Sequence, residues 1–104
     1  MAKTSTGCPI ARAATILGSR WTAQILRELT FEGPRRFQDL QDTLAGIAPT
    51  TLSARLKMLE EGGIVERRFY EDHPPRAEYV LTAKGRKMSG ILNAMRDWGA
   101  KYAD

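Results

Sequence analysis

The stretch that decides the fold runs from Arg35 to Thr82 and reads RRFQDLQDTLAGIAPTTLSARLKMLEEGGIVERRFYEDHPPRAEYVLT. Its first part predicts a short helix that begins at Phe37-Gln38-Asp39-Leu40, a turn at Gly46-Ile47-Ala48-Pro49, and a second helix from Thr50 to Glu61. Glycine and proline mark the turn, and the apolar residues of the second helix recur with helical spacing. This order indicates a helix-turn-helix.

Two strands follow the second helix. Ile64 to Tyr70 is rich in β-forming residues, and the residues of Ala77 to Thr82 alternate in polarity. We expect these strands to pair across Asp72-His73-Pro74-Pro75, where the two prolines favour a stiff, extended loop over a two-residue turn. The sequence therefore predicts an α+β, mostly helical fold, a winged helix-turn-helix. Such a shape suits the presentation of a helix to the major groove of DNA.

The second helix has two distinct faces. Leu52, Leu56 and Leu59 fall at positions i, i+4 and i+7, a spacing that turns all three toward the core. At about 100° per residue, the opposite side holds Thr50, Ala54 and Lys57, with Thr51 and Ser53 toward its edges. Arg55 lies beside the apolar stripe, so we expect its stem to pack while its guanidinium reaches outward.

The flanking segments predict further helices. One runs from Pro9 to Leu17 and ends at Gly18, a second from Trp21 to Leu29, and a last one from about Ala83 to Tyr102. The last helix has a long apolar face, which a core this small is not expected to cover, so we expect the terminal helices to form a dimer. The predicted dimer-interface residues are Ile10, Ile91, Leu92, Met95, Trp98 and Tyr102.

The two tryptophans allow another interpretation. A dimer interface that contains Trp21 and Trp98 is able to bind a small aromatic ligand. A tryptophan at helical spacing within an apolar stripe is more often a packing residue. We therefore expect Trp21 in the core and Trp98 in the dimer interface.

Composition narrows the class of protein. The 104 residues suffice for one domain spanning 1–104, in which the small, polar residues 1–7 are expected to be disordered. Sixteen basic against twelve acidic residues give a net charge of +4, which suits an acidic partner such as nucleic acid. No apolar run approaches the roughly 20 residues that span a bilayer, and the N-terminus has no apolar signal region, so we expect a cytoplasmic protein without a membrane partner.

The residues expected to meet DNA come from three places. At the start of the second helix, Thr50, Thr51, Ser53 and Ala54, preceded by Pro49, are placed to meet base edges, while Arg55 and Lys57 suit phosphates. Arg35 and Arg36 precede the first helix of the pair and either grip the backbone or form a solvated loop pair.

The wing supplies the remaining candidates, namely His73, Pro75 and Arg76 at its tip. Arg76 either enters a narrow minor groove or forms an ion pair with Glu71 or Glu78. Arg67 and Arg68 leave opposite faces of the strand, so at most one of them is expected to face DNA.

Cys8 is the only cysteine, so it cannot form an intrachain disulfide. If Pro9 is the first helical residue, Cys8 is the N-cap, where the helix dipole favours a thiolate. An exposed thiolate can be oxidised and can condense with a second thiol, for example that of a dimer mate. The alternative, favoured slightly, is a small apolar residue that fills a gap beside the helix.

Short motifs in a fixed order carry a family resemblance. They are Cys8-Pro9-Ile10, Gly18-Ser19-Arg20-Trp21-Thr22, Leu26-Arg27-Glu28-Leu29, Gly33-Pro34-Arg35-Arg36-Phe37, Leu44-Ala45-Gly46-Ile47, Leu52-Ser53-Ala54-Arg55-Leu56, Leu59-Glu60-Glu61-Gly62-Gly63-Ile64-Val65, Pro74-Pro75-Arg76-Ala77-Glu78-Tyr79 and Leu81-Thr82-Ala83-Lys84-Gly85. Over nearly its whole length the chain resembles the HxlR-type winged-helix transcriptional regulators, which are related to the MarR group.

The resemblance implies a homodimer, built from the terminal helices, that binds a pseudo-palindromic operator in double-stranded DNA. It also implies that some members sense oxidants or electrophiles through the cysteine that matches Cys8. This chain departs from the pattern at Ala48, where the family often has Ser, so a side-chain cap of the second helix is lost. Pro49 partly compensates for that loss by fixing φ at the first helical position.

Three functional classes remain for comparison. The leading hypothesis is a homodimeric repressor that binds specific DNA, with an oxidant, an electrophile or a small ligand as its candidate effector. The alternative is a winged-helix module for protein interaction without specific DNA binding. An enzyme is the weakest hypothesis, because one histidine and one cysteine make a mononuclear zinc site implausible, and the chain has no Gly-rich phosphate loop. We expect no metal and no cofactor.

Overall fold

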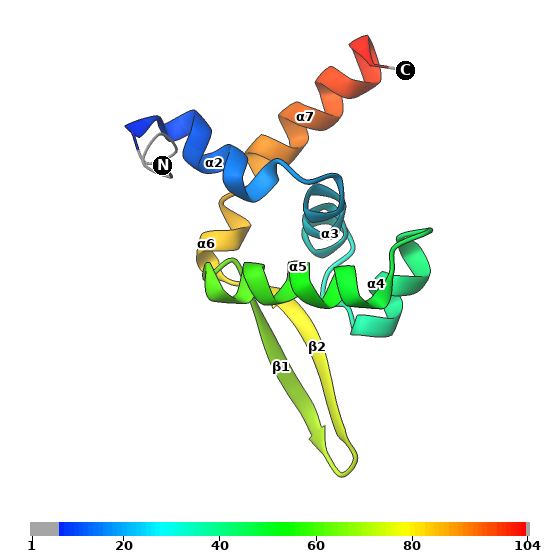
Figure 1. Cartoon of the computed structure of the whole chain (residues 1–104). Coiled ribbons are helices and arrows are strands. Elements are labelled where there is room, and N and C mark those ends of the chain that lie inside the picture. Colours follow the sequence, from blue (N-terminus) through cyan, green and yellow to red (C-terminus); the bar gives the residue numbers. More distant parts are fainter. Residues whose placement is uncertain (1–6, 104) are drawn as a thin grey trace.

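The computed structural model describes residues 7–103 of the chain (Figure 1). Its elements are, in order, α2 (Pro9–Leu17), α3 (Arg20–Phe31), α4 (Phe37–Thr43), α5 (Pro49–Glu61), β1 (Val65–Asp72), β2 (Pro75–Leu81), α6 (Ala83–Arg86) and α7 (Ser89–Tyr102). The predicted winged helix-turn-helix is confirmed. Of residues 1–7, for which we expected disorder, residues 1–6 lie outside the described part and Gly7 is exposed.

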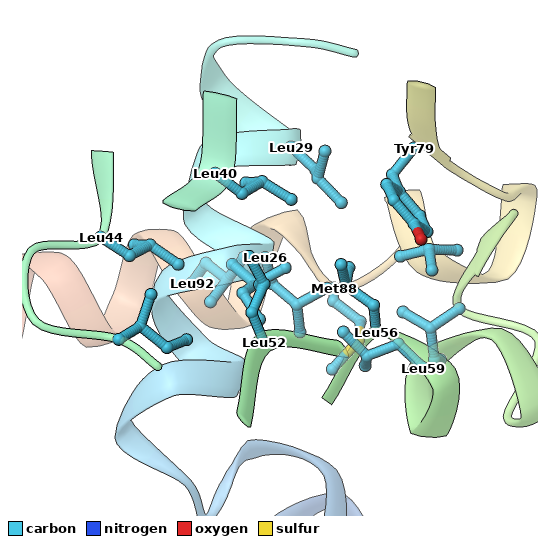
Figure 2. Close-up of a cluster of buried hydrophobic side chains, with 14 residues drawn as sticks. Leu26, Leu29, Leu40, Leu44, Leu52, Leu56, Leu59, Tyr79, Met88 and Leu92 are labelled. Atoms are coloured by element: carbon cyan, nitrogen blue, oxygen red, sulfur yellow. The ribbon is translucent and has the colours of Figure 1, made fainter. Parts of the chain in front are cut away.

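The core forms where α3, α4 and α5 meet the base of the wing and the start of α7 (Figure 2). The predicted apolar face of α5 is confirmed, because Leu52, Leu56 and Leu59 are only 0%, 1% and 1% exposed. Burial of one such side chain contributes about 1.5–3 kcal/mol. The other buried apolar residues are Ile25, Leu26 and Leu29 of α3, Leu40, Leu44 and Ile47 around the turn, Ile64, Val65 and Tyr79 of the wing base, and Met88 and Leu92.

The wing is an antiparallel pair of strands whose register runs from Val65 opposite Leu81 to Asp72 opposite Pro75. The expectation of an extended loop at the tip was wrong, because only His73 and Pro74 connect the strands, through a cis peptide bond. Proline is tolerated at the end of a ladder, where its missing N–H is not needed for pairing, so β2 begins already at Pro75.

The last helix is not continuous, so the prediction of one helix from Ala83 to Tyr102 was wrong. The amides of Lys87 and Met88 donate to carbonyls three residues earlier, which tightens the chain into a turn between α6 and α7. Packing explains the break. Gly85 lies so close to the backbone of Ile64 that a Cβ there would overlap its carbonyl oxygen, and Met88 is buried in the core.

The turn around α6 is tied directly to the end of α5. The Thr82 hydroxyl accepts a hydrogen bond from the Gly85 amide at 3.0 Å, which caps α6. The same hydroxyl lies 2.6 Å from the Gly63 carbonyl, to which it donates. Lys84 Nζ donates to the Gly62 carbonyl at 2.9 Å. Figure 1 shows the result, in which the wing and α7 project from opposite sides of the core. Within residues 7–103, no helix combines the length and apolar character needed to traverse a bilayer.

We expect Gly85→Ala to lower the free energy of unfolding by about 1–3 kcal/mol, because the added methyl group must displace backbone atoms of Ile64. Gly90→Ala is the matched control, since a Cβ there meets no atom within 4 Å. That variant should leave stability unchanged or raise it by up to about 1 kcal/mol through helix propensity. Urea unfolding at one fixed protein concentration measures both values, and equal stability of the two variants would contradict the packing described above.

Candidate nucleic-acid interface

The outward face of α5 is the first part of the candidate interface. Because Leu52 and Leu56 are buried, the opposite side of the helix is turned away from the core. Four of the predicted contact residues on this side, Thr50, Ser53, Ala54 and Lys57, are exposed, and Thr51 is half-buried. The helix thus presents two hydroxyl groups, a methyl group and an ammonium group to the solvent.

The first turn of α5 has no side-chain cap. Ala48 occupies the N-cap position, makes no side-chain hydrogen bond, and accepts a bond from the Leu52 amide through its carbonyl at 3.0 Å. Pro49 follows as the first helical residue and is exposed. The first amides of the helix therefore have no side-chain cap from Ala48.

Arg55 lies at the edge of the apolar stripe and is half-buried. Its Nε atom is buried and has no hydrogen-bond partner among the described residues. Burial of the stem is the arrangement expected for an arginine beside a leucine stripe. It brings the base of the side chain into the protein and limits how far the guanidinium reaches.

A cleft of about 370 Å³ separates α5 from the wing. Its lining residues are Ser53, Lys57, Glu60 and Glu61 of α5, Arg67 of β1 and Tyr79 of β2. Burial raises the pKa of the Tyr79 phenol; the charge of Glu60 acts in the same direction, and Arg67 opposes it. The cleft thus joins the exposed face of α5 to one face of the wing, and its polar lining contains charges of both signs. Sequence reasoning missed the role of Tyr79, because only the register of the strands brings it beside α5.

Two other arginines of the wing form ion pairs. Arg68 lies 2.9 Å from Glu78 across the strands, and Arg76 lies 2.8 Å from Glu71. Of the two alternatives for Arg76, the ion pair is the one that forms within the protomer, and its partner is Glu71. This surface pair is weak enough to exchange for a phosphate contact. His73 and Pro75 at the tip are exposed.

Arg35 is engaged inside the protein. Its amide donates to the Tyr79 carbonyl at 3.1 Å, and its carbonyl accepts from the Tyr79 amide at 2.6 Å, so it adds a bridge to the edge of β2. Its guanidinium lies 3.7 Å from Glu28 and 3.6 Å from Glu32. Neither of the expected roles describes this residue fully, since its backbone and side chain both fasten the wing to α3.

Arg36 caps α4 together with Asp39. The Asp39 carboxylate accepts from the Arg36 amide at 3.0 Å and from its guanidinium at 2.9 Å. These hydrogen bonds lower the pKa of Asp39 and raise the pKa of Arg36. Arg36 remains exposed, so it is available at the surface, although it already carries a carboxylate partner.

A separate apolar surface runs along α7. Four of its predicted interface residues are exposed, with Ile91 at 42%, Met95 at 45%, and Trp98 and Tyr102 at 62% each, and Ile10 on α2 is 81% exposed. Leu92 differs from the prediction, because it is only 6% exposed and packs in the core, where the start of α7 crosses α3. Trp21 is half-buried against the core.

Sequence reasoning also missed Phe31, which is 37% exposed beside this apolar surface. It lines a groove of about 280 Å³ between α3 and α7, together with Met95 and Leu92. The guanidinium of Arg96 lies 5.2 Å from the centre of its ring. Phe31 lay beyond the predicted end of its helix at Leu29, so its position was not assigned to any face.

Cys8 is the N-cap of α2, as expected, and its free thiol is exposed. Its side chain makes no capping hydrogen bond, while its carbonyl accepts from the Arg12 amide at 2.9 Å. Within the protomer it fills no apolar gap, which was the alternative interpretation. An exposed thiol at the end of a helix is accessible to oxidants.

Comparison with known proteins agrees with this geometry. Residues 16–104 match the HxlR-like helix-turn-helix family. The chain is 42% identical over 97 residues to an HTH-type transcriptional regulator of Synechocystis sp., and the alignment covers 93% of this chain and 71% of that protein. It is 34% identical over 101 residues to the HTH-type transcriptional regulator YodB of Bacillus subtilis, across 96% and 89% of the two chains. It also resembles the solved structure of the redox regulator HypR in its oxidized form, with a TM-score of 0.85, 31% identity and coverage of 93% and 99%.

Proposed function

Because the chain belongs to the HxlR-like helix-turn-helix family, whose relatives are transcriptional regulators, we propose that it is a cytoplasmic, homodimeric repressor that binds a specific operator in double-stranded DNA. The observation that carries this proposal is the exposed face of α5, which bears Thr50, Ser53, Ala54 and Lys57 beside the wing. Repression is the simpler direction of control, because steric occlusion of a promoter requires DNA binding alone.

In this proposal α5 enters the major groove. The hydroxyl groups of Thr50, Thr51 and Ser53 donate to or accept from base edges, and the methyl group of Ala54 contacts thymine. Lys57 binds phosphate, as does Arg55 from the edge of the helix. Pro49 sets the start of the helix, where uncapped amides face the DNA backbone.

The regions around α5 make additional contacts. Arg36 and the wing residues His73, Pro75 and Arg76 approach the DNA backbone or the minor groove beside the recognition helix. To reach DNA, Arg76 exchanges its exposed ion pair with Glu71 for a phosphate. Arg35 contributes mainly by holding the wing in position, since its backbone pairs with Tyr79.

The operator experiment starts from duplexes that the protein selects from a random-sequence pool. We expect tight binding to a selected duplex and weak binding to a scrambled duplex of the same length. Thr50→Ala combined with Ser53→Ala should cost about 1–3 kcal/mol for each lost base contact and should relax sequence preference, while Lys57→Gln should weaken binding to both duplexes alike. Equal affinity of the wild type for selected and scrambled duplexes would instead favour the alternative function, a protein-interaction module.

Dimer formation would cover the exposed side chains of α7. The rings of Trp98 and Tyr102 lie 5.4 Å apart and form an aromatic pair with no core to cover it in the protomer. Aromatic residues of this kind contribute strongly to interfaces. In the proposed dimer, Ile10, Ile91, Met95, Trp98 and Tyr102 meet the terminal helices of a second copy, and Leu92 supports α7 from the core.

We expect sedimentation velocity to give a dimer for the wild type and a shift toward monomer for Met95→Lys and for Trp98→Ala. Both side chains are exposed in the protomer, so neither change should unfold it. Asp97→Ala is the matched control on the same helix, because Asp97 is exposed and lies outside the apolar face. A monomeric wild type, or a dimer that resists the two substitutions combined, would refute this interface.

The proposed control of DNA binding is oxidation at Cys8, and a small ligand at the dimer interface is the other form of control. Similarity to a redox regulator and the exposure of the thiol both support the first. A disulfide between two copies of Cys8 forms when two thiols give up two protons and two electrons to an oxidant such as diamide. Such a bond would fix the relative positions of the two N-terminal helices.

Treatment with diamide should therefore release the wild type from its selected duplex and produce a dimer band on a non-reducing gel. Dithiothreitol should restore binding by reducing the disulfide. Cys8→Ser should bind the same duplex, and its affinity should not change when diamide is added. If wild type and variant respond alike, or if neither responds, the regulator is not controlled through this thiol.

A further inference from the structure

We infer that the cleft between α5 and the wing seats a backbone phosphate of the duplex, held by Lys57 from the helix and by Arg67 from the wing. The inference rests on the proposed function and assigns a DNA contact to Arg67 but not to Arg68. These two neighbours have the same side chain and lie on the same strand. The structure separates them in three ways, by face, by charge pairing and by their neighbouring rings.

The strand register places the two arginines on different faces of the wing. Arg67 is opposite Tyr79, and both line the cleft beside α5. Arg68 is opposite Glu78 and lines a groove on the other side, together with Glu66. Successive side chains of a strand point to opposite faces, so only Arg67 shares its side of the wing with the exposed face of α5.

Charge pairing separates them further. Arg68 is neutralised by Glu78 at 2.9 Å, and Arg76 by Glu71 at 2.8 Å. Among the ion pairs of residues 7–103, none involves Arg67 or Lys57. The cleft therefore holds one guanidinium and one ammonium group that form no direct ion pair, although Glu60 and Glu61 also line it, and a phosphate is able to pair with both cations.

Two rings are neighbours of Arg67 on its face of the wing, namely that of Phe69 and that of Tyr79, the cross-strand partner of Arg67. The Cζ atom of Arg67 lies 5.4 Å from the centre of the Phe69 ring, and its charge partly offsets the increase in the pKa of the Tyr79 phenol that burial causes. Contact with a ring face leaves the N–H donors of an arginine free for an oxyanion in the plane of the guanidinium.

The helix side of the cleft defines where the phosphate sits. Ser53 and Lys57 are one turn apart on α5 and line the same cleft. Glu60 and Glu61 follow at its other end, at the C-terminus of the helix, and repel a phosphate from there. The seat is therefore at the Ser53–Lys57 end, beside the residues proposed to meet base edges, and it fixes how α5 lies along the groove.

The test is the salt dependence of binding to the selected duplex and to the scrambled duplex. Arg67→Gln should weaken binding to both and reduce the slope of log K against log salt by about 0.9 for each bound protomer, because one phosphate contact per protomer is lost. Arg68→Gln is the matched control and should keep the wild-type slope. Urea unfolding should give both variants the wild-type stability, since each side chain is exposed.

Two results would overturn the inference while leaving the proposed function intact. One is a wild-type slope for Arg67→Gln, and the other is an equal loss of slope for both variants, which would mean that the wing acts only through its diffuse field. A wild type that binds neither duplex would remove the proposed function and the phosphate seat together.

Discussion

The burial of three leucines on α5 is the constraint on which the rest of the structure depends. Leu52, Leu56 and Leu59 are almost completely inaccessible, and they pack against α3 and the wing base. A helix fixed along such a stripe cannot rotate about its axis without exposing apolar surface. The orientation of Thr50, Ser53 and Lys57 is therefore a consequence of the core, and the rigidity of this face does not depend on a side-chain cap at Ala48.

The face that the wing turns toward α5 depends on the register in which β1 pairs with β2. The backbone of Arg35 pairs with Tyr79, and the end of β1 at Val65 is buried. These contacts hold the strands in one register, and a slip of a single residue would exchange the two faces of the wing. Arg67 would then lie where Arg68 lies. The charge that faces the cleft is thus determined by the buried residue opposite it, Tyr79, and by the buried start of β1 at Val65.

Local patterns were sufficient to predict some features of this chain and insufficient for others. The period of the leucines identifies the outward face of α5, and the predicted end of that helix at Glu61 is confirmed, because both signals are local. The break between α6 and α7 was missed, since it depends on the contact of Gly85 with Ile64, 21 positions earlier in the chain. Leu92 was assigned to the wrong surface for a similar reason. The apolar stripe of α7 is buried in the core at Leu92 and exposed to solvent from Met95 onward, and residue spacing alone does not indicate where the burial ends.

The same break has a consequence for the proposed dimer. Through Thr82 and Lys84, α6 is bonded to Gly62 and Gly63, which directly follow α5. Met88 and Leu92 then anchor the start of α7 in the core, and the helix continues outward with Met95, Trp98 and Tyr102 exposed. The direction of α7 is therefore set by contacts at the end of α5. In a symmetric pair joined through α7, that junction fixes the separation of the two α5 helices, and this separation must match successive major grooves, about 34 Å apart along the duplex. In the proposed dimer, a change at Cys8 would act on this separation through α2, without altering the side chains of α5 that are proposed to contact bases.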